Sequence, residues 1–242
     1  MKYSYVTDKG MRRQENQDCC YAFEPEPGAL FAIVCDGMGG ENAGDIASTL
    51  AVETIVHRIR TGWHRNMQPA SVKNLLLTSI TAANICVYDL AQSEEIYRGM
   101  GTTVVCAVLL GDNVTIAHAG DSRAYLCNGG LRQLTKDHSL VQELLDAGDL
   151  SPEEAKNYPQ KNYITRALGV IEQIQIDFAR AELKPDETLL LCSDGLTNYV
   201  SDEEIRRIIR EEKDADPAKT LVSQANLGGG GDNITAVVIT NC

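Results

Sequence analysis

The sequence lacks several patterns on which common enzyme chemistries depend. It contains only four histidines, and none of its eight cysteines forms a Cys-x-x-Cys pair, so the usual ligand sets of zinc are missing. The Gly-x-x-x-x-Gly-Lys-Ser/Thr pattern of P-loop NTPases is missing as well. A glycine run at 228–231 precedes an apolar run typical of a strand, whereas a nucleotide-binding loop precedes a helix. Zinc and P-loop chemistry are therefore disfavoured.

Basic charge is also scarce. The chain has 22 Lys and Arg against 34 Asp and Glu, a formal net charge of −12. This balance argues against nucleic acid and anionic membranes as partners, because both require a basic face. We expect no transmembrane helix, and the first eighteen residues show no apolar segment of a secretory signal.

The cysteines favour a reducing compartment. Several lie inside apolar runs, at 31–35, 102–110 and 189–193. In such runs cysteine behaves as a small buried hydrophobe rather than as a disulfide partner. We therefore expect a cytoplasmic protein.

A length of 242 residues and an apolar fraction of 43% indicate one large domain, covering 1–242. Residue periodicity and turn signals predict the following elements. Strands are expected at 2–8, 19–23, 29–35, within 102–134, at 174–183, 188–193 and 233–240; helices are expected at 41–60, 69–92, 139–148, from 151, at 202–212 and at 216–227. Two groups of strands with helices between them favour a β-sandwich covered by helices.

Three distant segments each place an aspartate at the edge of an apolar β-type run. Asp36 follows the run in FAIVCDGMGG, Asp194 follows LLLCS, and Asp232 precedes NITAVVIT. Bringing three carboxylates together is costly unless a cation lies between them, and hard divalent cations prefer oxygen ligands. Gly37 would let its backbone carbonyl approach the same ion. The pattern predicts a Mg²⁺ or Mn²⁺ site, in which two ions could hold a hydroxide for attack at phosphorus.

The order of motifs resembles the metal-dependent protein phosphatases, the PPM or type 2C family. The resemblance rests on GMRRQENQD, VCDGMGG, MGTTVVCAVL, IAHAGDSRAYL, LTKDHSLVQELLDAG, NYITRALG, LLLCSDGL and GDNITAVVI, which cover nearly the whole chain. The compact form is similar to bacterial members. The resemblance implies an α+β fold with four α-β-β-α layers, a central antiparallel β-sandwich flanked by paired helices.

The resemblance also implies roles for individual residues. Asp36 and the Gly37 carbonyl correspond to the ligands of one metal, and Asp36, Asp194 and Asp232 to those of the second. Asp121 corresponds to the ligand of a third metal, shared with Asp194. Arg13 corresponds to the arginine that binds the substrate phosphate, for which a planar guanidinium is suited. Asp18, Gln17 and Asn233 are expected beside these groups.

Two positions depart from the family pattern. Gln17 stands where many members have glutamate, so we expect it to orient water rather than ligate a metal. Met38 stands where eukaryotic members have a histidine, which leaves the general acid unassigned. Of the four histidines, we expect His57 and His64 on helix surfaces and His118 packed within a strand; His138 could approach the site, but we expect a structural role for it.

The function implied is hydrolysis of phosphoserine and phosphothreonine in proteins, with two Mn²⁺ or Mg²⁺ ions and a third at Asp121. A eukaryotic-like Ser/Thr kinase would be the counterpart. The alternatives are a small-molecule phosphomonoesterase, or a catalytically weak binding or sensor module of the same fold. A cysteine-based phosphatase is disfavoured, since no cysteine is followed by five residues and an arginine. The polar segment 148–163 is a candidate flap beside the active site.

Overall fold

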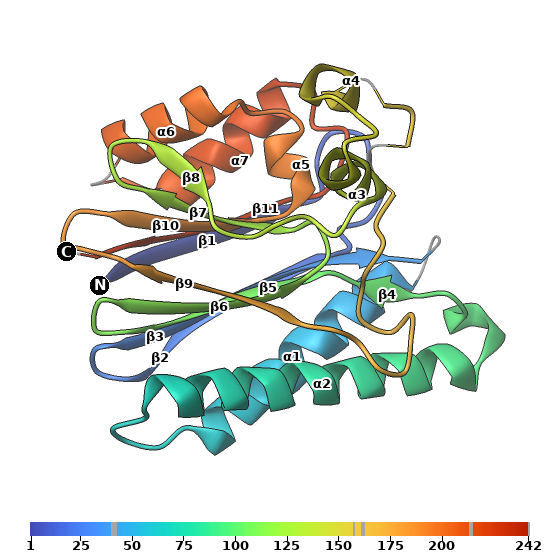
Figure 1. The fold of residues 1–242 in the computed structure, drawn as a ribbon, viewed down its shortest axis with the longest axis horizontal. Coiled ribbons are helices and arrows are strands. Elements are labelled where there is room, and N and C mark those ends of the chain that lie inside the picture. Colours follow the sequence, from blue (N-terminus) through green and yellow to red (C-terminus); the bar gives the residue numbers. More distant parts are fainter. Residues whose placement is uncertain (40–42, 157, 161–162, 213–214, 242) are drawn as a thin grey trace.

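Two antiparallel sheets face each other at the centre of the molecule (Figure 1). The computed structural model describes residues 1–39, 43–156, 158–160, 163–212 and 215–241. In spatial order, the first sheet contains β1 (Lys2–Asp8), β11 (Ile234–Thr240), β10 (Thr188–Cys192), β7 (Arg123–Cys127) and β8 (Leu131–Gln133). The second contains β2 (Asp18–Glu26), β3 (Ala29–Met38), β5 (Val104–Leu110), β6 (Asn113–Ala119) and β9 (Asp177–Glu182), with β4 (Gly101–Thr102) paired to β3.

Helices cover the outer face of each sheet, which gives four layers (Figure 1). Helices α1 (Gly44–Gly62) and α2 (Pro69–Ser93) pack on the six-stranded sheet, and α6 (Asp202–Glu211) and α7 (Pro217–Leu227) pack on the five-stranded sheet. The predicted α-β-β-α sandwich is confirmed.

The continuous apolar runs follow from burial of both faces of each sheet. Alternate residues of a strand point to opposite faces. In β5, Val105, Ala107 and Leu109 lie between the sheets. The residues between them, Val104, Cys106 and Val108, pack under α1 and α2 instead. Such a strand has no polar face, which explains why its sequence does not alternate.

Helix α2 corrects the expectation that no segment is long and apolar enough to cross a membrane. It has 25 residues, and its most apolar 18-residue window has a mean hydropathy of 1.3, so by length and composition it could cross a membrane. Only 39% of its most apolar window is buried, but that part includes Val72, Leu76 and Ile80, which pack in the core shared with α1 and the sheet. Its apolar character therefore has a structural explanation in this fold.

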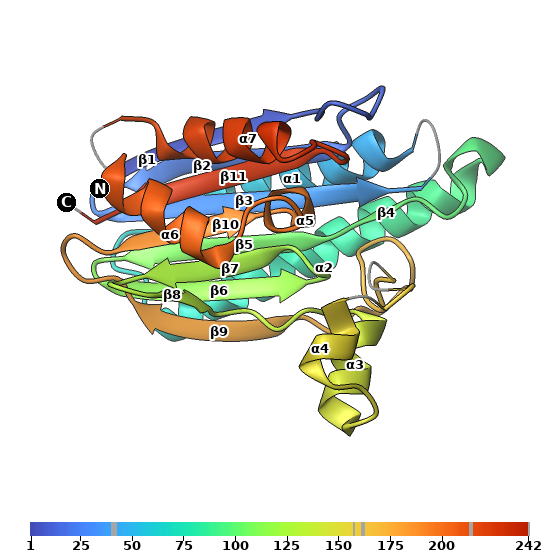
Figure 2. The ribbon, with the colours of Figure 1, turned by 90° about the horizontal axis from the view of Figure 1, so that it is seen from above.

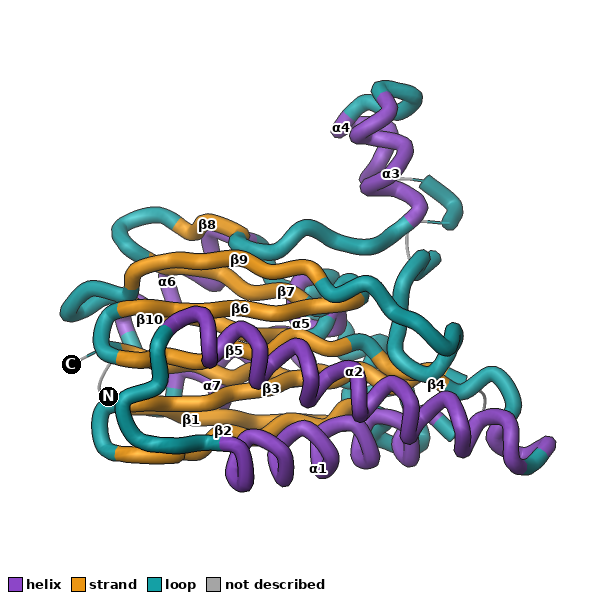
Figure 3. Tube along the Cα trace, turned by 60° about the horizontal axis from the view of Figure 1, so that its bottom comes forward, coloured by secondary structure: helices purple, strands orange, loops and turns teal. Residues whose placement is uncertain are grey.

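The local signals for helix ends are largely confirmed. Ser201 caps α6 and Asp216 caps α7 through backbone amides three residues later. Gly148 ends α3 (Leu140–Ala147) with a left-handed φ of 78°. Ser151 and Glu154 form the expected capping box of α4 (Pro152–Lys156). Helices α3 and α4 project from one edge of the sandwich (Figures 2 and 3).

Some boundaries differ from the prediction. Strand β3 continues through Asp36 to Met38, and β9 begins at Asp177 rather than at 174. Helix α1 begins at Gly44, while residues 41 and 42 of the expected helix, like 157 and 161–162 of the candidate flap, lie outside the described residues. Two short helices had no predicted counterpart: the 3-10 helix Glu95–Tyr97 and α5 (Asp194–Thr197).

Candidate active site

The strand order explains how aspartates from distant segments meet. Strands β10 and β11 are antiparallel neighbours, so the end of β10, followed by Asp194, lies beside the start of β11, preceded by Asp232. Asp36 lies near the end of β3 in the facing sheet. Asp121 lies in the connection between β6 and β7, which crosses from one sheet to the other. Asp36, Asp121, Asp194 and Asp232 line one cavity of about 850 Å³.

Two threonines fix the backbone of Asp36: Thr102, the last residue of β4, and Thr103, which lies between β4 and β5. The Asp36 carbonyl accepts hydrogen bonds from the Thr102 hydroxyl at 2.9 Å and from the Thr103 amide at 2.8 Å. The Asp36 amide donates to the Thr103 hydroxyl at 3.0 Å. Because all three bonds hold the main chain, the Asp36 side chain is aimed into the cavity from a rigid support.

Two glycines allow the close approach of backbone that the site requires. A Cβ atom on Gly37 would lie 2.5 Å from the carbonyl oxygen of Gln17, and one on Gly195 would collide with the carbonyl of Asn233. The Gly37 amide also donates to the Gln17 carbonyl at 3.0 Å. The predicted use of Gly37 is consistent with this packing, since no larger residue fits there.

Burial and repulsion by neighbouring carboxylates raise the pKa values of Asp36, Asp121 and Asp194. The pKa of Asp36 is raised well above its usual range, first by burial and then by Asp18 and Asp194. Burial, followed by the charge of Asp194, raises the pKa of Asp121 to about 7. The pKa of Asp194 is raised by burial and by Asp232. A cluster that disfavours its own charged form is suited to bind cations.

Asp18 supports the cavity from behind. Its Oδ2 atom accepts hydrogen bonds from the hydroxyls of Ser193 and Thr235, each at 2.7 Å, while Oδ1 is buried with no hydrogen-bond partner among the described residues. Burial raises its pKa to about 7, although both hydroxyl bonds lower it. Asp18 pairs with Asp36 in the register of β2 and β3, but it is not among the residues that line the cavity. Its predicted place beside the ligands is consistent with this geometry.

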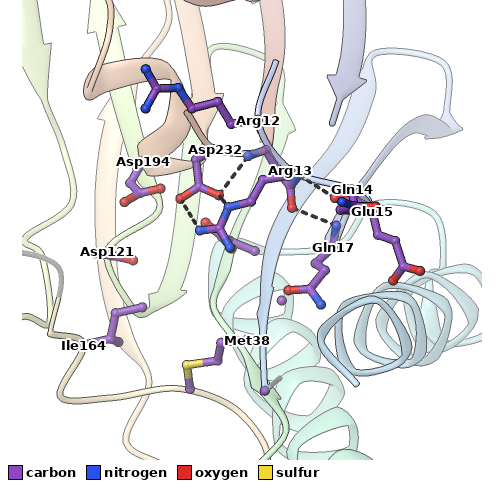
Figure 4. Close-up of a pocket in the computed structure, with 14 residues that line it drawn as sticks. Arg12, Arg13, Gln14, Glu15, Gln17, Met38, Asp121, Ile164, Asp194 and Asp232 are labelled. Carbon is purple, nitrogen blue, oxygen red and sulfur yellow. Dashed lines mark hydrogen bonds and ion pairs between the residues drawn. The ribbon is translucent and has the colours of Figure 1, made fainter. Parts of the chain in front are cut away.

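Arg13 lies at the rim, on the loop before β2 (Figure 4). Its Nε atom lies 2.9 Å from Asp232 Oδ1, and its Nη2 donates to Oδ2 at 2.9 Å. The Arg13 side chain is 53% exposed, so the guanidinium remains accessible from solvent. The structure thus brings Arg13 into the site; its role in binding phosphate stays a prediction.

Asn233 holds the loop that carries Arg13. Its Nδ2 donates to the carbonyls of Lys9 and Glu15, and its Oδ1 accepts from the Gln17 amide at 2.9 Å. One side chain thereby ties both ends of the 9–17 loop to the start of β11. Gln17 also lines the cavity, where its neutral amide adds no charge.

The donor set fits hard divalent cations. The cavity offers carboxylate oxygens, and Asp121 Oδ1 is buried without a hydrogen-bond partner in the part of the chain that the structure describes. No histidine or cysteine is among its described lining residues. Asp36, Asp194, Asp232 and the Gly37 carbonyl could hold two ions, and Asp121 with Asp194 a third.

The histidines are confirmed in structural positions, with one correction. His57 is exposed on α1, whereas exposed His64 follows the helix, since Trp63 is its C-cap. His118 is buried on β6 and stacks on His138 at 4.8 Å between ring centroids. The His138 ring accepts from the Gly120 amide at 3.0 Å, directly before Asp121, and does not line the cavity.

Four hydroxyl residues that support the site were not identified from sequence: Thr102, Thr103, Ser193 and Thr235. Each lies within or beside a recognised motif, but their partners are remote; the Thr235 hydroxyl bonds to Asp18 across 217 positions. A hydroxyl near a strand end gives no sequence signal for such a partner.

Comparison with known proteins agrees with this geometry. The family model of protein phosphatase 2C matches residues 10–222. A Ser/Thr phosphatase stp from Listeria welshimeri is 40% identical over 99% of this chain and 95% of its own length. The solved Ser/Thr phosphatase of S. agalactiae has a TM-score of 0.91 at 39% identity, covering 99% of each chain.

A structure of the catalytic domain of the Ser/Thr phosphatase PstP, in complex with two manganese ions, has a TM-score of 0.84 at 33% identity. It covers 98% of this chain and 96% of that one. A family model and relatives that extend over nearly the whole length leave little of the chain unaccounted for. The chain belongs to the protein phosphatase 2C family.

Proposed function

We propose that this enzyme removes phosphate from phosphoserine and phosphothreonine in proteins, in a metal-dependent hydrolysis. The observation that carries the proposal is the single cavity in which Asp36, Asp121, Asp194 and Asp232 meet beside Arg13. The relatives with Ser/Thr phosphatase activity in their names support the same substrate class. A binding or sensor module is disfavoured, because every predicted carboxylate ligand is present.

The residues of this chain have two tasks in this proposal: to bind the metal ions and to position the substrate phosphate. Bound divalent ions supply positive charge that lowers the pKa of water and polarises the phosphoryl group. Asp36, Asp194 and Asp232 would hold those ions from or beside strand ends, and Arg13 would offer two N–H groups to phosphate oxygens. Since no described lining residue is a histidine, we propose water as the proton source for the leaving alkoxide.

We propose Mn²⁺ or Mg²⁺ as the metal, with two ions at the Asp36, Gly37, Asp194 and Asp232 oxygens and a third at Asp121. The all-oxygen donor set supports these ions over Zn²⁺. EDTA should abolish turnover of a phosphopeptide and of p-nitrophenyl phosphate, and Mn²⁺ or Mg²⁺ should restore both. Restoration by Zn²⁺ alone would contradict the assignment.

Comparing kcat/KM for a phosphopeptide and for p-nitrophenyl phosphate distinguishes a protein phosphatase from a small-molecule phosphomonoesterase. We expect a phosphoserine or phosphothreonine peptide to have the higher kcat/KM with Mn²⁺, because a peptide contacts more of the surface around the cavity. If p-nitrophenyl phosphate and free phosphoserine were turned over as well as peptides, the small-molecule phosphomonoesterase would be the better description.

Four further expectations stay proposals. Residues 1–242 form one domain, supported by a core between the sheets that runs from Ala22 to Ile239. Segment 148–163 acts as a flap. Its described part projects from the sandwich (Figure 2), and shortening it should alter phosphoprotein turnover while sparing p-nitrophenyl phosphate.

The counterpart of this enzyme is a eukaryotic-like Ser/Thr kinase. The location is cytoplasmic, supported by seven described cysteines that are all free.

A further inference from the structure

A second pocket adjoins the catalytic cavity on the side of α3 and α5. It has a volume of about 380 Å³ and shares Asp121 and Asp194 with the catalytic cavity. The remaining walls come from α3, α4 and α5 and from the Asp137–Ser139 connection. Two pockets that share carboxylates are close enough for one extended peptide to occupy both, since a residue spans about 3.3–3.6 Å. We call the second one the flank pocket.

Three apolar, incompletely buried side chains of α3 and α4 line the flank pocket, next to the polar Ser139 and Gln142. Val141 and Leu145 of α3 and Ala155 of α4 line it, and all three are half-buried. Helix α3 is amphipathic, yet none of its residues is fully buried. Its apolar side chains at the pocket therefore keep surface that a ligand can cover with a gain in free energy.

The charged residues of this pocket, apart from the two shared aspartates, neutralise each other. Arg123 Nε lies 3.0 Å from both carboxylate oxygens of Asp137, and Nη2 lies 2.6 Å from Oδ2. Arg123 Nη1 is used as well, donating to the Tyr125 hydroxyl at 3.1 Å. No free cationic side chain is left on the described walls to attract an acidic side chain; the proposed third ion would lie at the border with the catalytic cavity, at the shared Asp121 and Asp194.

The wall from α5 is polar but uncharged. Thr197 and Asn198 line it, and Asn198 Nδ2 donates to Asp194 Oδ2 at 2.9 Å. Gln142 adds a second amide from α3. These groups can satisfy the backbone of a bound peptide, while the apolar side receives its side chain.

We propose that the flank pocket binds an uncharged aliphatic side chain close in sequence to the phosphorylated residue of the substrate. This inference rests on the proposed function, and it adds a sequence preference: phosphopeptides with leucine or methionine at that position are better substrates than those with aspartate or glutamate. The preference comes from apolar burial against Val141 and Leu145, on the side of the pocket away from the shared aspartates, where no free cationic side chain is available to pair with an acid.

The test compares phosphopeptides that differ at one position, scanned over three residues on either side of the phosphothreonine. Leucine, lysine and glutamate are placed at each position in turn, and kcat/KM is measured with Mn²⁺. We expect one position at which leucine exceeds glutamate by about tenfold, the scale of burying part of one aliphatic side chain. Equal kcat/KM for leucine and glutamate at every position would overturn the proposal.

Variants then assign the preference to the pocket. Leu145→Lys should abolish it or turn it toward glutamate, with p-nitrophenyl phosphate turnover unchanged. Leu144→Lys is the matched control, since Leu144 is a half-buried neighbour on the same helix that does not line the pocket. If Leu145→Lys lowers the melting temperature, Val141→Lys tests the same wall. An unaltered preference in both pocket variants, or an equal change in Leu144→Lys, would overturn the assignment.

These outcomes are separate from failure of the proposed function. If no phosphopeptide is hydrolysed while p-nitrophenyl phosphate is, the protein-phosphatase proposal fails, and the flank pocket with it. If all peptides are hydrolysed equally, only the flank pocket fails.

Discussion

Two polar clusters, each assembled from segments that are distant in the sequence, differ in how their charge is balanced. The first contains the carboxylates of the cavity, and the second contains His118, His138, Asp177 and Arg166. The ligand atoms of His118, His138 and Asp177 lie within 4.8 Å of one another, so by spacing alone they resemble a metal site. The spacing of ligand atoms alone is nevertheless a poor guide to a metal site, because the histidine cluster contains its own cation whereas the carboxylate cluster has an excess of acidic groups.

The histidine cluster includes its own cation. Arg166 Nη1 lies 3.1 Å from Asp177 Oδ1 and 2.9 Å from His138 Nε2, so it contacts two of the three residues that could ligate an ion. The Gly120 amide donates to His138 Nδ1 at 3.0 Å, and His138 Nε2 lies 3.1 Å from Asp177 Oδ2. His138 and Asp177 are thereby occupied by Arg166 and the Gly120 amide, while His118 Nδ1 is buried without a hydrogen-bond partner among the described residues.

In the carboxylate cluster, Arg13 pairs with Asp232, whereas burial and repulsion raise the pKa values of Asp36, Asp121 and Asp194. A cation can relieve this repulsion, and nothing comparable is needed at the histidines. An excess of like charge, rather than the proximity of ligand atoms, therefore distinguishes the metal site in this fold.

Asp36→Asn is the strongest test of this contrast. It should lower kcat/KM with Mn²⁺ roughly a thousandfold, about 4 kcal/mol, because the carboxylate predicted to be shared by two ions is lost. In EDTA the melting temperature should stay equal or rise, since one repelling charge is removed. Enzyme assays and thermal melts with and without EDTA measure both effects.

Asp177→Asn is the matched control in the other cluster. It should leave the Mn²⁺ dependence unchanged and lower the stability by about 1 kcal/mol, because it weakens contacts with Arg166 and His138. Near wild-type activity in Asp36→Asn, or loss of metal activation in Asp177→Asn, would reverse the roles of the two clusters.

Arg13→Ala should have the next largest effect. We expect a loss of about 1.5–3 kcal/mol in kcat/KM, typical of one charge-assisted group that binds phosphate. Mn²⁺ affinity, measured by calorimetry, should change less. Arg13→Lys keeps the charge but loses the planar fork, so it should recover only part of the loss. An unchanged kcat/KM in Arg13→Ala would place this arginine outside the reaction.

Asp121→Ala sharpens the comparison within the carboxylate cluster. If Asp121 recruits a third ion, turnover should fall about tenfold, or ~1.4 kcal/mol, while two ions remain bound. Calorimetry gives the number of ions, and an Mn²⁺ titration of activity gives the dependence. Identical activity of variant and wild type across that titration would remove the third ion from the account.

The sequence was a good guide to the fold because its signals were local and consistent. The capping residues Ser151, Ser201 and Asp216, the left-handed Gly148 and the both-face-apolar β5 each predicted their element. Helix α5 was not predicted, because a helix of only four residues is too short to show a helical period in the sequence.

The residues of the site that belong to sequence motifs were predictable from the order of those motifs. Asp36, Asp194, Asp232, Arg13 and Gly37 all line the cavity. What the sequence could not show are contacts made across the fold: the bond from Ser193 to Asp18 joins residues 175 positions apart, and the bond from Thr102 to Asp36 joins residues 66 positions apart. The contact of Arg166 with the histidine cluster also depends on the tertiary structure.

The two clusters should respond oppositely to pH. Burial lowers the pKa of His118 from 6.5 to about 4, with His138 as a second cause. The unfolded chain therefore takes up a proton at His118 below pH 6.5 before the folded protein does, so stability falls between pH 6.5 and 4. Carboxylates with raised pKa values have the opposite effect, because in metal-free protein the folded state takes up protons first.

His118→Gln isolates the contribution of the histidine cluster. Between pH 7 and pH 5.5, the wild type should lose about 1 kcal/mol of unfolding free energy relative to the variant. Urea unfolding in EDTA at both pH values measures this difference, and the carboxylate contributions cancel because both proteins contain them. Glutamine is a fair replacement, since it retains a polar side chain at a position that is only 3% exposed. A difference between the two proteins that does not change with pH would mean that His118 is protonated as easily in the fold as outside it, and the contrast between the histidine cluster and the carboxylate cluster would lose its electrostatic basis.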